Sequence, residues 1–262
     1  MITLTMKVID GLGRVLAEQS GEGQVSMVYT REYSQGDRIQ LSASGYNIPV
    51  IWQVDDALGA AYCFVTKEVQ YMVPFGEKRS VYSPKVFSGG KHYLYARIAN
   101  ESEVRWYRNL AENVADQHDV EGCYPHASAN VETRGEAVFA ARNAIDGISE
   151  NHGHGEWPYT SWGINRDPNA EMKVEFGRVV MADRVGIILR ADFPHDAYWT
   201  QGTIAFSDGS EEILEFRKTD ELQLFKITPR ETEWIKIGTL IKADDPSPFP
   251  ALTQIQVYGW ET

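Results

Sequence analysis

The sequence predicts an all-β protein made of two β-sandwich (jelly-roll) domains joined by a short helix. Two observations support this. Short runs of alternating apolar residues recur along the 262 residues, and Gly, Pro, Asp or Ser separates each run from the next. Parallel α/β folds would place helical segments of ten or more residues between such runs. The length is sufficient for a large core and favours two domains.

Strand signals follow one another at short intervals in the first half, which we assign to a domain of residues 1–121. Met1–Ile9 alternates enough to form a strand, and the rest of residues 1–30 is weakly patterned. In Arg38–Ser42 the apolar positions point to one side of the strand. The remaining predicted strands are 50–54, 60–65, 69–73, 81–86 and 93–99. Such alternation is typical of strands with one buried face.

One helix is predicted between the two halves. Asn100 with Glu103 three residues later forms a capping box. The apolar residues Val104, Tyr107, Leu110, Ala111 and Val114 then fall on one helical face. The pattern ends near residues 116–119, so we place the domain boundary before residue 122.

The second domain, residues 122–262, begins with a loop and a short predicted helix at 136–143. Asp146-Gly147 reads as a turn, and Ser207–Ser210 reads as a hairpin turn. The proline-rich stretch Asp244–Pro250 reads as a rigid connection. The predicted strands are 171–176, 184–190, 202–206, 211–217, 222–227, 234–240 and 252–258. This number of strands suits a jelly roll.

Charge and composition exclude several classes of partner. The formal net charge is −12, with 12 basic and 15 acidic residues in 1–121 and 13 and 22 in 122–262. No basic run is available for nucleic acid or an anionic membrane. No stretch has the roughly 20 apolar residues of a membrane span. The first residues do not read as a secretory signal, so we expect a cytoplasmic protein, or a secreted one if a leader has been removed.

The two cysteines, Cys63 and Cys123, lie one in each half. A disulfide scaffold is excluded, and two free thiols are favoured over one long-range bridge. The sequence leaves their pairing and the oligomeric state open.

Residues 122–262 resemble a galactose-binding-like domain of the discoidin, or coagulation factor type C (F5/8 type C), kind. The matching pieces are, in order, Ala127–Ala129, Ala144-Ile-Asp-Gly147, Trp162, Val174-Glu-Phe-Gly177, Val185–Leu189, Phe206-Ser-Asp-Gly209 and Gln254–Trp260. The insert between Asp146 and Trp162 is longer than that pattern has. The resemblance implies a mostly non-catalytic, lectin-like module that binds its ligand through loops at one end of the sandwich.

The resemblance also implies a structural calcium ion. Asp146 and Glu261 stand where members of this kind place calcium ligands. Calcium takes six to eight oxygen ligands, and backbone carbonyls of residues 144–151 are available to complete the set. The alternative is that Asp146 only shapes its turn and Glu261 is a solvated terminal charge.

Sugar binding requires an aromatic face for the ring and polar partners for its hydroxyl groups. The loops of the second domain are rich in both kinds of residue. We therefore predict non-catalytic carbohydrate binding at an aromatic loop rim, with the ligand contacts Trp157, Tyr159, Arg190, Asp192, His195, Trp199, His152 and His154. The alternative is that Trp162 and Trp199 cap the core and that Arg190 pairs with a neighbouring carboxylate.

Two other functions stay open at this point. A carbohydrate-active enzyme would use Asp192 or Asp196 as acid or base in a site between the domains. An assembly protein would use the aromatic rim against another protein. A transition-metal site at His152 and His154 is disfavoured, because the flanking glycines indicate a loop and no acidic residue follows at the required spacing.

Overall fold

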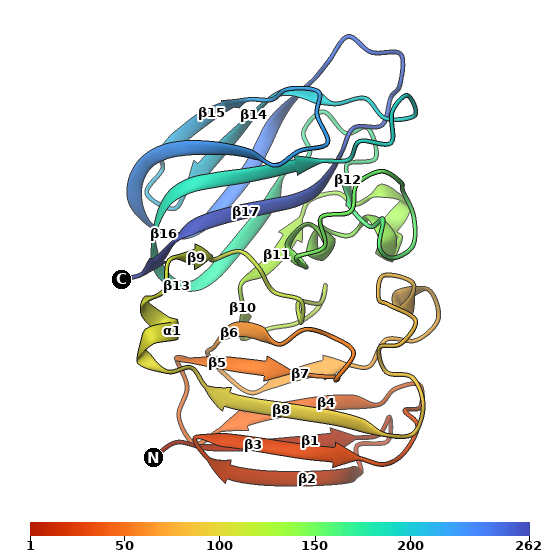
Figure 1. The fold of residues 1–262 in the computed structure, drawn as a ribbon, viewed down its shortest axis with the longest axis vertical. Helices are drawn as coiled ribbons and strands as arrows, with labels where there is room; N and C mark the ends of the chain where they lie inside the picture. The colour runs from red at the N-terminus through yellow and green to blue at the C-terminus, as the bar shows by residue number, and fades with distance from the viewer.

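The computed structural model describes residues 1–262, and nearly all of its regular structure is β-strand. The all-β prediction is confirmed. Strands β1 to β8 pack together at one end of an elongated molecule, and β13 to β17 pack at the other (Figure 1). None of its helices has the length and apolar character that a membrane crossing requires.

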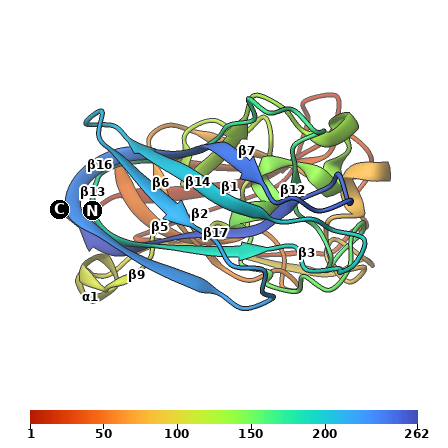
Figure 2. The ribbon, with the colours of Figure 1, turned by 90° about the horizontal axis from the view of Figure 1, so that it is seen from above.

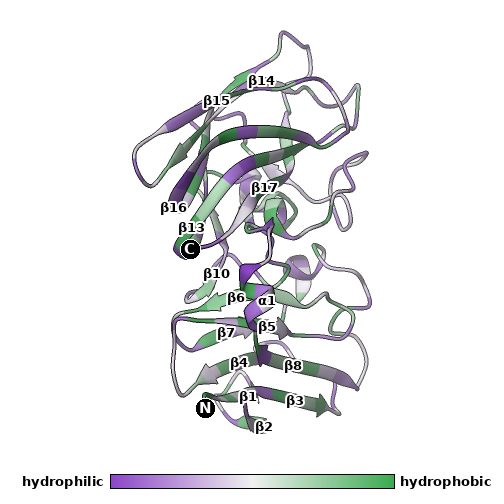
Figure 3. Ribbon diagram, turned by 60° about the vertical axis from the view of Figure 1, so that its left-hand side comes forward, coloured by the Kyte–Doolittle hydropathy of each residue, from purple (hydrophilic) through white to green (hydrophobic).

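The N-terminal sandwich consists of two antiparallel sheets, in the orders β2-β1-β4-β7 and β10-β6-β5-β8-β3. Its strands are β1 (Thr3–Ile9), β2 (Val15–Glu22), β3 (Gln24–Tyr29), β4 (Arg38–Ala43), β5 (Ile48–Gln53), β6 (Ala61–Val65), β7 (Val69–Met72), β8 (His92–Ile98) and β10 (Cys123–Tyr124). Alternate side chains such as Leu4, Met6 and Val8 are buried, and the ribbon alternates in hydropathy accordingly (Figure 3). Cys63 and Cys123 lie buried in this core as free thiols.

In the first half one predicted strand is wrong, and two strands were not predicted. Strands β2 and β3 lie in residues 1–30, where β2 has little alternation because most of its side chains are exposed. Residues 81–86 form turns, although Val81 and Val86 are buried in the core. The segment Gly76–Arg79 before them is a single 3₁₀ turn, η1.

The predicted helix is much shorter than its apolar pattern suggests. Helix α1 spans only Glu101–Arg105, although the capping box of Asn100 and Glu103 is present as predicted. The chain then extends into β9 (Arg108–Asn109), which pairs with β17. Pairing with a strand about 150 residues away therefore overrides the local helical periodicity.

The C-terminal sandwich is built from one curved antiparallel sheet in the order β12-β17-β13-β16-β14-β15, with β11 beside β13. Its strands are β11 (His126–Ala129), β12 (Trp162–Gly163), β13 (Met172–Leu189), β14 (Trp199–Phe206), β15 (Glu211–Glu215), β16 (Gln223–Lys242) and β17 (Ala251–Glu261). Trp162, Trp199 and Phe206 lie in the core that these strands enclose. Three 3₁₀ turns, η2 (Thr133–Gly135), η3 (Ala137–Phe139) and η4 (Ala141–Ile145), replace the helix predicted at 136–143.

Two long, bent strands replace four predicted short ones. The predicted strands 171–176 and 184–190 are the two ends of β13, and 222–227 and 234–240 belong to β16. Within β13, Gly177 has φ +69°, and the ring of Tyr124 lies where a Cβ atom would be. The bend lets the first part of β13 pair with β11 and the second part with β17.

The hairpin turn predicted at Ser207–Ser210 is confirmed, because β14 and β15 pair on either side of it. Both chain termini lie on one side of the elongated molecule, whereas β12, the 3₁₀ turns and the long loops gather on the opposite side (Figure 2). We call the end of the C-terminal sandwich that lies on this opposite side its loop end.

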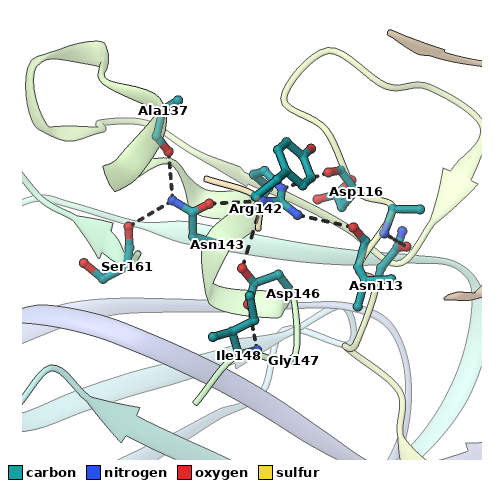
Figure 4. Close-up of polar contacts among 12 residues, drawn as sticks. Asn113, Asp116, Ala137, Arg142, Asn143, Asp146, Gly147, Ile148 and Ser161 are labelled. Carbon is teal, nitrogen blue, oxygen red and sulfur yellow. Dashed lines mark hydrogen bonds and ion pairs between the residues drawn. The ribbon is translucent and has the colours of Figure 1, made fainter. Parts of the chain in front are cut away.

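Arg142 lies where the two sandwiches meet. Its Nε donates a hydrogen bond to the carbonyl of Asp116 at 2.8 Å, and its Nη2 donates to the carbonyl of Val114 at 3.4 Å. The guanidinium carbon is 5.0 Å from the centre of the Tyr82 ring, which belongs to the N-terminal core. One buried side chain thus joins η4, the connecting segment and the first core (Figure 4).

Candidate functional site

A cavity of about 610 Å³ lies at the loop end of the C-terminal sandwich. Its walls come from segments that are far apart in the sequence: residues 133–139, 163–166, 190–196 and 246–251, together with His154. The loop before β17 is the blue one at the top of Figure 1. Short 3₁₀ turns and strand ends position these residues, because a sandwich of this kind gathers its connections at its two ends.

Arg166 and Phe249 form a stacked pair in this cavity. The guanidinium carbon of Arg166 lies 4.4 Å from the centre of the Phe249 ring. Phe249 is 46% exposed, and Arg166 is also exposed. No carboxylate lies within ion-pair distance of Arg166. The pair therefore presents a flat, partly apolar surface with free hydrogen-bond donors.

The backbone that carries Arg166 is in an uncommon conformation. Asn165 and Arg166 have φ angles of +49° and +61°, so two successive residues other than glycine adopt the left-handed region. The amide of Asn165 donates to Oγ1 of Thr133 at 2.9 Å, and the amide of Asp167 donates to the carbonyl of Ile164 at 2.8 Å. Such conformations persist only where the surroundings hold them, and they cluster at binding sites.

Two histidines share one carboxylate beside the cavity. Nδ1 of His154 lies 2.9 Å from one oxygen of Asp192, and Nδ1 of His195 lies 3.5 Å from the other. The hydrogen bond from His154 is the main reason why the pKa of Asp192 is lowered. Because Nδ1 of each ring faces Asp192, each Nε2 stays free to meet a ligand.

Arg190 holds the cavity wall and does not offer a free head group. Its Nε and Nη2 donate to the two oxygens of Asp196 at 2.9 and 2.5 Å, and Nη2 also donates to the carbonyl of Phe249 at 3.1 Å. Arg190 and Asp196 are both buried. The alternative of the sequence analysis, a pairing with a neighbouring carboxylate, is what the structure has. Arg190 positions the loop that carries Phe249.

Trp157 and Tyr159 lie on the long loop before β12, outside the cavity lining. They are 38% and 40% exposed. The amide of Trp157 donates to the carbonyl of Ser80 at 2.8 Å, so this part of the loop is attached to the N-terminal sandwich. The Tyr159 ring packs against the backbone of Gly153.

Two further predicted ligand contacts, Trp199 and His152, also lie outside the cavity lining. Trp199 is 1% exposed and lies in the hydrophobic core, where it has no access to a surface ligand. His152 lies on the surface between Glu150 and Asp220, at 3.1 and 3.0 Å. These hydrogen bonds, that to Asp220 first, raise the pKa of His152. Both residues therefore drop out of the site that we consider below.

Asp146 and Glu261 do not come together as a calcium site. Asp146 accepts hydrogen bonds from Gln254 at 2.9 Å and from the amide of Ile148 at 2.9 Å (Figure 4). Glu261 lies seven residues beyond Gln254 on β17, which corresponds to about 23 Å of extended strand. Arg108 and Arg178 both bind Glu261, and Nη1 of Arg142 lies 4.0 Å from Asp146. Guanidinium groups at these positions oppose a second cation.

One cluster of two aspartates and a histidine has the spacing that a metal ion accepts. Asp55, Asp56 and His92 each place one ligand atom within 4.8 Å of the others. Both nitrogens of His92 already face acceptors, since Nδ1 lies 3.1 Å from Asp55 and Nε2 lies 2.9 Å from the carbonyl of Gly89. Both ring nitrogens are thus already engaged, so the imidazole offers no free nitrogen to a metal.

The cavity residues that the sequence analysis missed include Arg134, Asn165, Arg166 and Phe249. The stretch Asp244–Pro250 was interpreted as a connection only. Its one available signal was Phe249 between two prolines, an aromatic residue in a segment that cannot join a strand. Asn165 and Arg166 carry no periodic pattern, and their left-handed backbone is invisible in sequence.

No protein-family model matches this chain, and no curated protein matches it significantly. Solved structures similar to it include chitosan-binding module 1 from a chitosanase/glucanase of Paenibacillus sp. IK-5, at 22% identity over 58% of this chain and 98% of that chain, with a TM-score of 0.40. A second is the family 32 carbohydrate-binding module of C. perfringens NanJ in complex with galactose, at 21% identity, 50% and 91% coverage and a TM-score of 0.39. A third is the lectin domain of lectinolysin complexed with Lewis B antigen, at 16% identity, 58% and 96% coverage and a TM-score of 0.42. The chain is thus similar to structures of carbohydrate-binding modules, at low identity.

Proposed function

We propose that this protein binds carbohydrate non-catalytically in the cavity at the loop end of the C-terminal sandwich. The observation that carries the proposal is the Arg166–Phe249 pair at 4.4 Å, with His154 and His195 in the same cavity wall. An aromatic ring suits the apolar face of a sugar, and guanidinium and imidazole groups suit its hydroxyl groups.

The cavity volume of about 610 Å³ supports a small ligand, since such sites usually occupy roughly 300–1,000 Å³. Its side chains are held before any ligand arrives. Asp192 orients the two imidazoles, Arg190 holds the Phe249 loop, and Thr133 fixes the turn that carries Arg166. Groups that are already in place lose less conformational entropy on binding.

The chemistry of Asp192 and Asp196 favours binding over hydrolysis. A glycosidase needs one carboxyl group with a raised pKa as its acid. Asp196 is engaged by both donor groups of Arg190 and by the amide of Asp192. The pKa of Asp192 is lowered by its hydrogen bond to His154. Neither carboxyl group is thus arranged to deliver a proton.

A glycan-array screen of the full chain, with a Phe249→Ala variant beside the wild type, tests the proposal. Loss of the aromatic face is expected to weaken binding by about fivefold, because aromatic contacts contribute about 1 kcal/mol beyond area burial. The unfolding temperature should stay close to that of the wild type, since the ring is already 46% exposed.

Trp157→Ala serves as the matched comparison, because Trp157 is also an exposed aromatic residue of the loop end but lies outside the cavity lining. Its binding should remain near that of the wild type. If Trp157→Ala abolishes binding and Phe249→Ala does not, the ligand occupies the outer rim. If the folded wild type binds no glycan, the proposed function is wrong.

The same binding experiment is repeated with calcium and with a chelator. The site that we propose uses no carboxylate cage, and Asp146 and Glu261 are each close to arginine. Binding should therefore be equal in calcium and in chelator. A calcium-dependent affinity would restore the metal expected from the sequence resemblance.

A further inference from the structure

The lining of the cavity is rich in arginine, although the protein as a whole is acidic. The chain carries a formal charge of −12. The titratable residues that line the cavity are three arginines, two histidines and a single acid: Arg134, Arg166, Arg190, His154, His195 and Asp196. Glu136 and Asp192 lie beside these residues and offset the excess of arginine. The charge that a ligand would meet is therefore that of an arginine without a carboxylate partner.

The one acid of the lining is already neutralised. Asp196 is 1% exposed and binds Arg190 through two hydrogen bonds. Arg134 is also committed, because its Nε and Nη2 donate to the two oxygens of Glu136 at 2.5 and 2.7 Å. Arg166 is the remaining arginine of the lining, and it has no carboxylate partner. A guanidinium group without a carboxylate partner thus lies in the cavity lining.

We propose that the saccharide taken by this cavity carries an anionic group, either a carboxylate or a sulfate, that binds to Arg166. This inference rests on the proposed function and specifies its ligand class. The planar guanidinium group presents a rigid fork of donors that matches the oxygens of such groups. Its stacking on Phe249 and the left-handed turn at Asn165 and Arg166 fix the direction of that fork.

The two imidazoles extend the same recognition. Asp192 takes Nδ1 of both His154 and His195, so each Nε2 is available as a donor or acceptor toward the cavity. An acidic sugar carries hydroxyl groups next to its anionic group. Arg166 therefore selects the charge, and the histidines meet the neighbouring hydroxyl groups.

A matched set of ligands separates charge from sugar. Oligogalacturonate and its methyl ester share the same rings but differ in charge, and a sulfated galactan and its desulfated form do the same for sulfate. Calorimetry with the full chain should show at least one acidic member binding about tenfold or more tighter than its neutral counterpart, and the difference should shrink as salt is raised. The pair that shows the preference identifies the source of the anionic group.

Two substitutions locate the effect. Arg166→Gln keeps hydrogen-bonding capacity but removes the charge, so it should abolish the preference and lower the affinity for the acidic form to about that for the neutral one. Arg31→Gln is the control, because Arg31 is an exposed arginine without an ion pair in the N-terminal sandwich.

The failures of the two proposals differ in kind. Equal affinity for acidic and neutral saccharides, or a preference that survives Arg166→Gln, would overturn the ligand class while leaving carbohydrate binding intact. Absence of binding to every saccharide by the folded protein would overturn the proposed function and this inference with it.

Discussion

Two carboxylates of the C-terminal sandwich, the half-buried Glu261 and the buried Asp146, are held in opposite ways. Arg178 meets Glu261 with two hydrogen bonds of 2.5 Å, and Arg108 adds a third of the same length. Asp146 has its guanidinium neighbour, Arg142, at 4.0 Å, and its Oδ2 atom has no hydrogen-bond partner. Burial raises the pKa of Asp146 to about 6. Burial acts in the same direction on Glu261, but the hydrogen bonds and charges of Arg178 and Arg108 together lower its pKa.

An arginine lies near each carboxylate, but only Glu261 is hydrogen-bonded by one. The hydrogen bonds of Asp146 come from the neutral groups of Gln254 and Ile148, and its pKa stays raised. Every guanidinium around Glu261 is satisfied within the fold, whereas Arg166 at the loop end has no carboxylate partner.

The largest expected effect comes from removing Glu261. Glu261→Ala leaves two mostly buried guanidinium groups without their shared partner, so the free energy of unfolding should fall by about 3–5 kcal/mol. Urea denaturation at neutral pH measures it, and saccharide binding by the folded variant should not change. A loss below about 1 kcal/mol would mean that this network is no stronger than a surface ion pair.

The pH dependence of stability tests Asp146 next. In the folded protein the pKa of Asp146 is about 6, above the ordinary aspartate value of 3.8. Between these two pH values the folded state therefore holds a proton that the unfolded state has released. Asp146 should thus reduce stability progressively as pH rises from about 4 through 6, by about 3 kcal/mol in total. Asp146→Asn should remove this loss, as denaturation curves between pH 4 and 7 will show.

Glu261 should give the opposite limb of the same profile. In the folded protein the pKa of Glu261 lies below 4.5, the ordinary value for a glutamate side chain. The ionised carboxylate therefore stabilises the fold fully above about pH 4.5, and this stabilisation is lost as the pH falls through the folded pKa. Glu261→Gln should flatten this acid limb and leave the Asp146 limb in place. If one substitution alters both limbs, the two groups are coupled and the comparison fails.

The smallest expected effect concerns Glu112, whose charge contributes to the raised pKa of Asp146. Glu112 is exposed and lies beside Gly147. Glu112→Gln should lower the folded pKa of Asp146 slightly, so the Asp146 limb should end at a slightly lower pH and its height should fall in proportion. A shift to higher pH would mean that Glu112 acts through packing and not through its charge.

The strand cores were predictable because period-2 burial leaves a direct mark, as in β1 and β4. The bend of β13 was not, because Gly177 and Arg178 look like a turn in sequence and only the partner strands show that pairing continues. Helix α1 began where its capping box indicated, but its end depends on the distant pairing of β9 with β17.

In the candidate site, too, local features were predictable and contacts between distant residues were not. His154, Arg190 and His195 were recognisable as polar residues in aromatic loops, and they do line the cavity. The sequence does not show whether a charged side chain is free or paired. The pairing of Arg190 with Asp196, for example, depends on how a loop folds back over six residues. Arg166 owes its position to Thr133 and Phe249, which are distant in sequence.

The hydrogen bonds of Arg142 have a practical consequence for anyone who wishes to produce the C-terminal sandwich alone. A fragment that starts at residue 122 lacks the carbonyls of Val114 and Asp116, and it also lacks Leu110 and Ala111, which belong to the C-terminal core. Its buried guanidinium would lose those acceptors, and its hydrophobic interior would be open on one side. A longer fragment that begins at β9 keeps all of these groups, and we expect it to express as a soluble, folded protein.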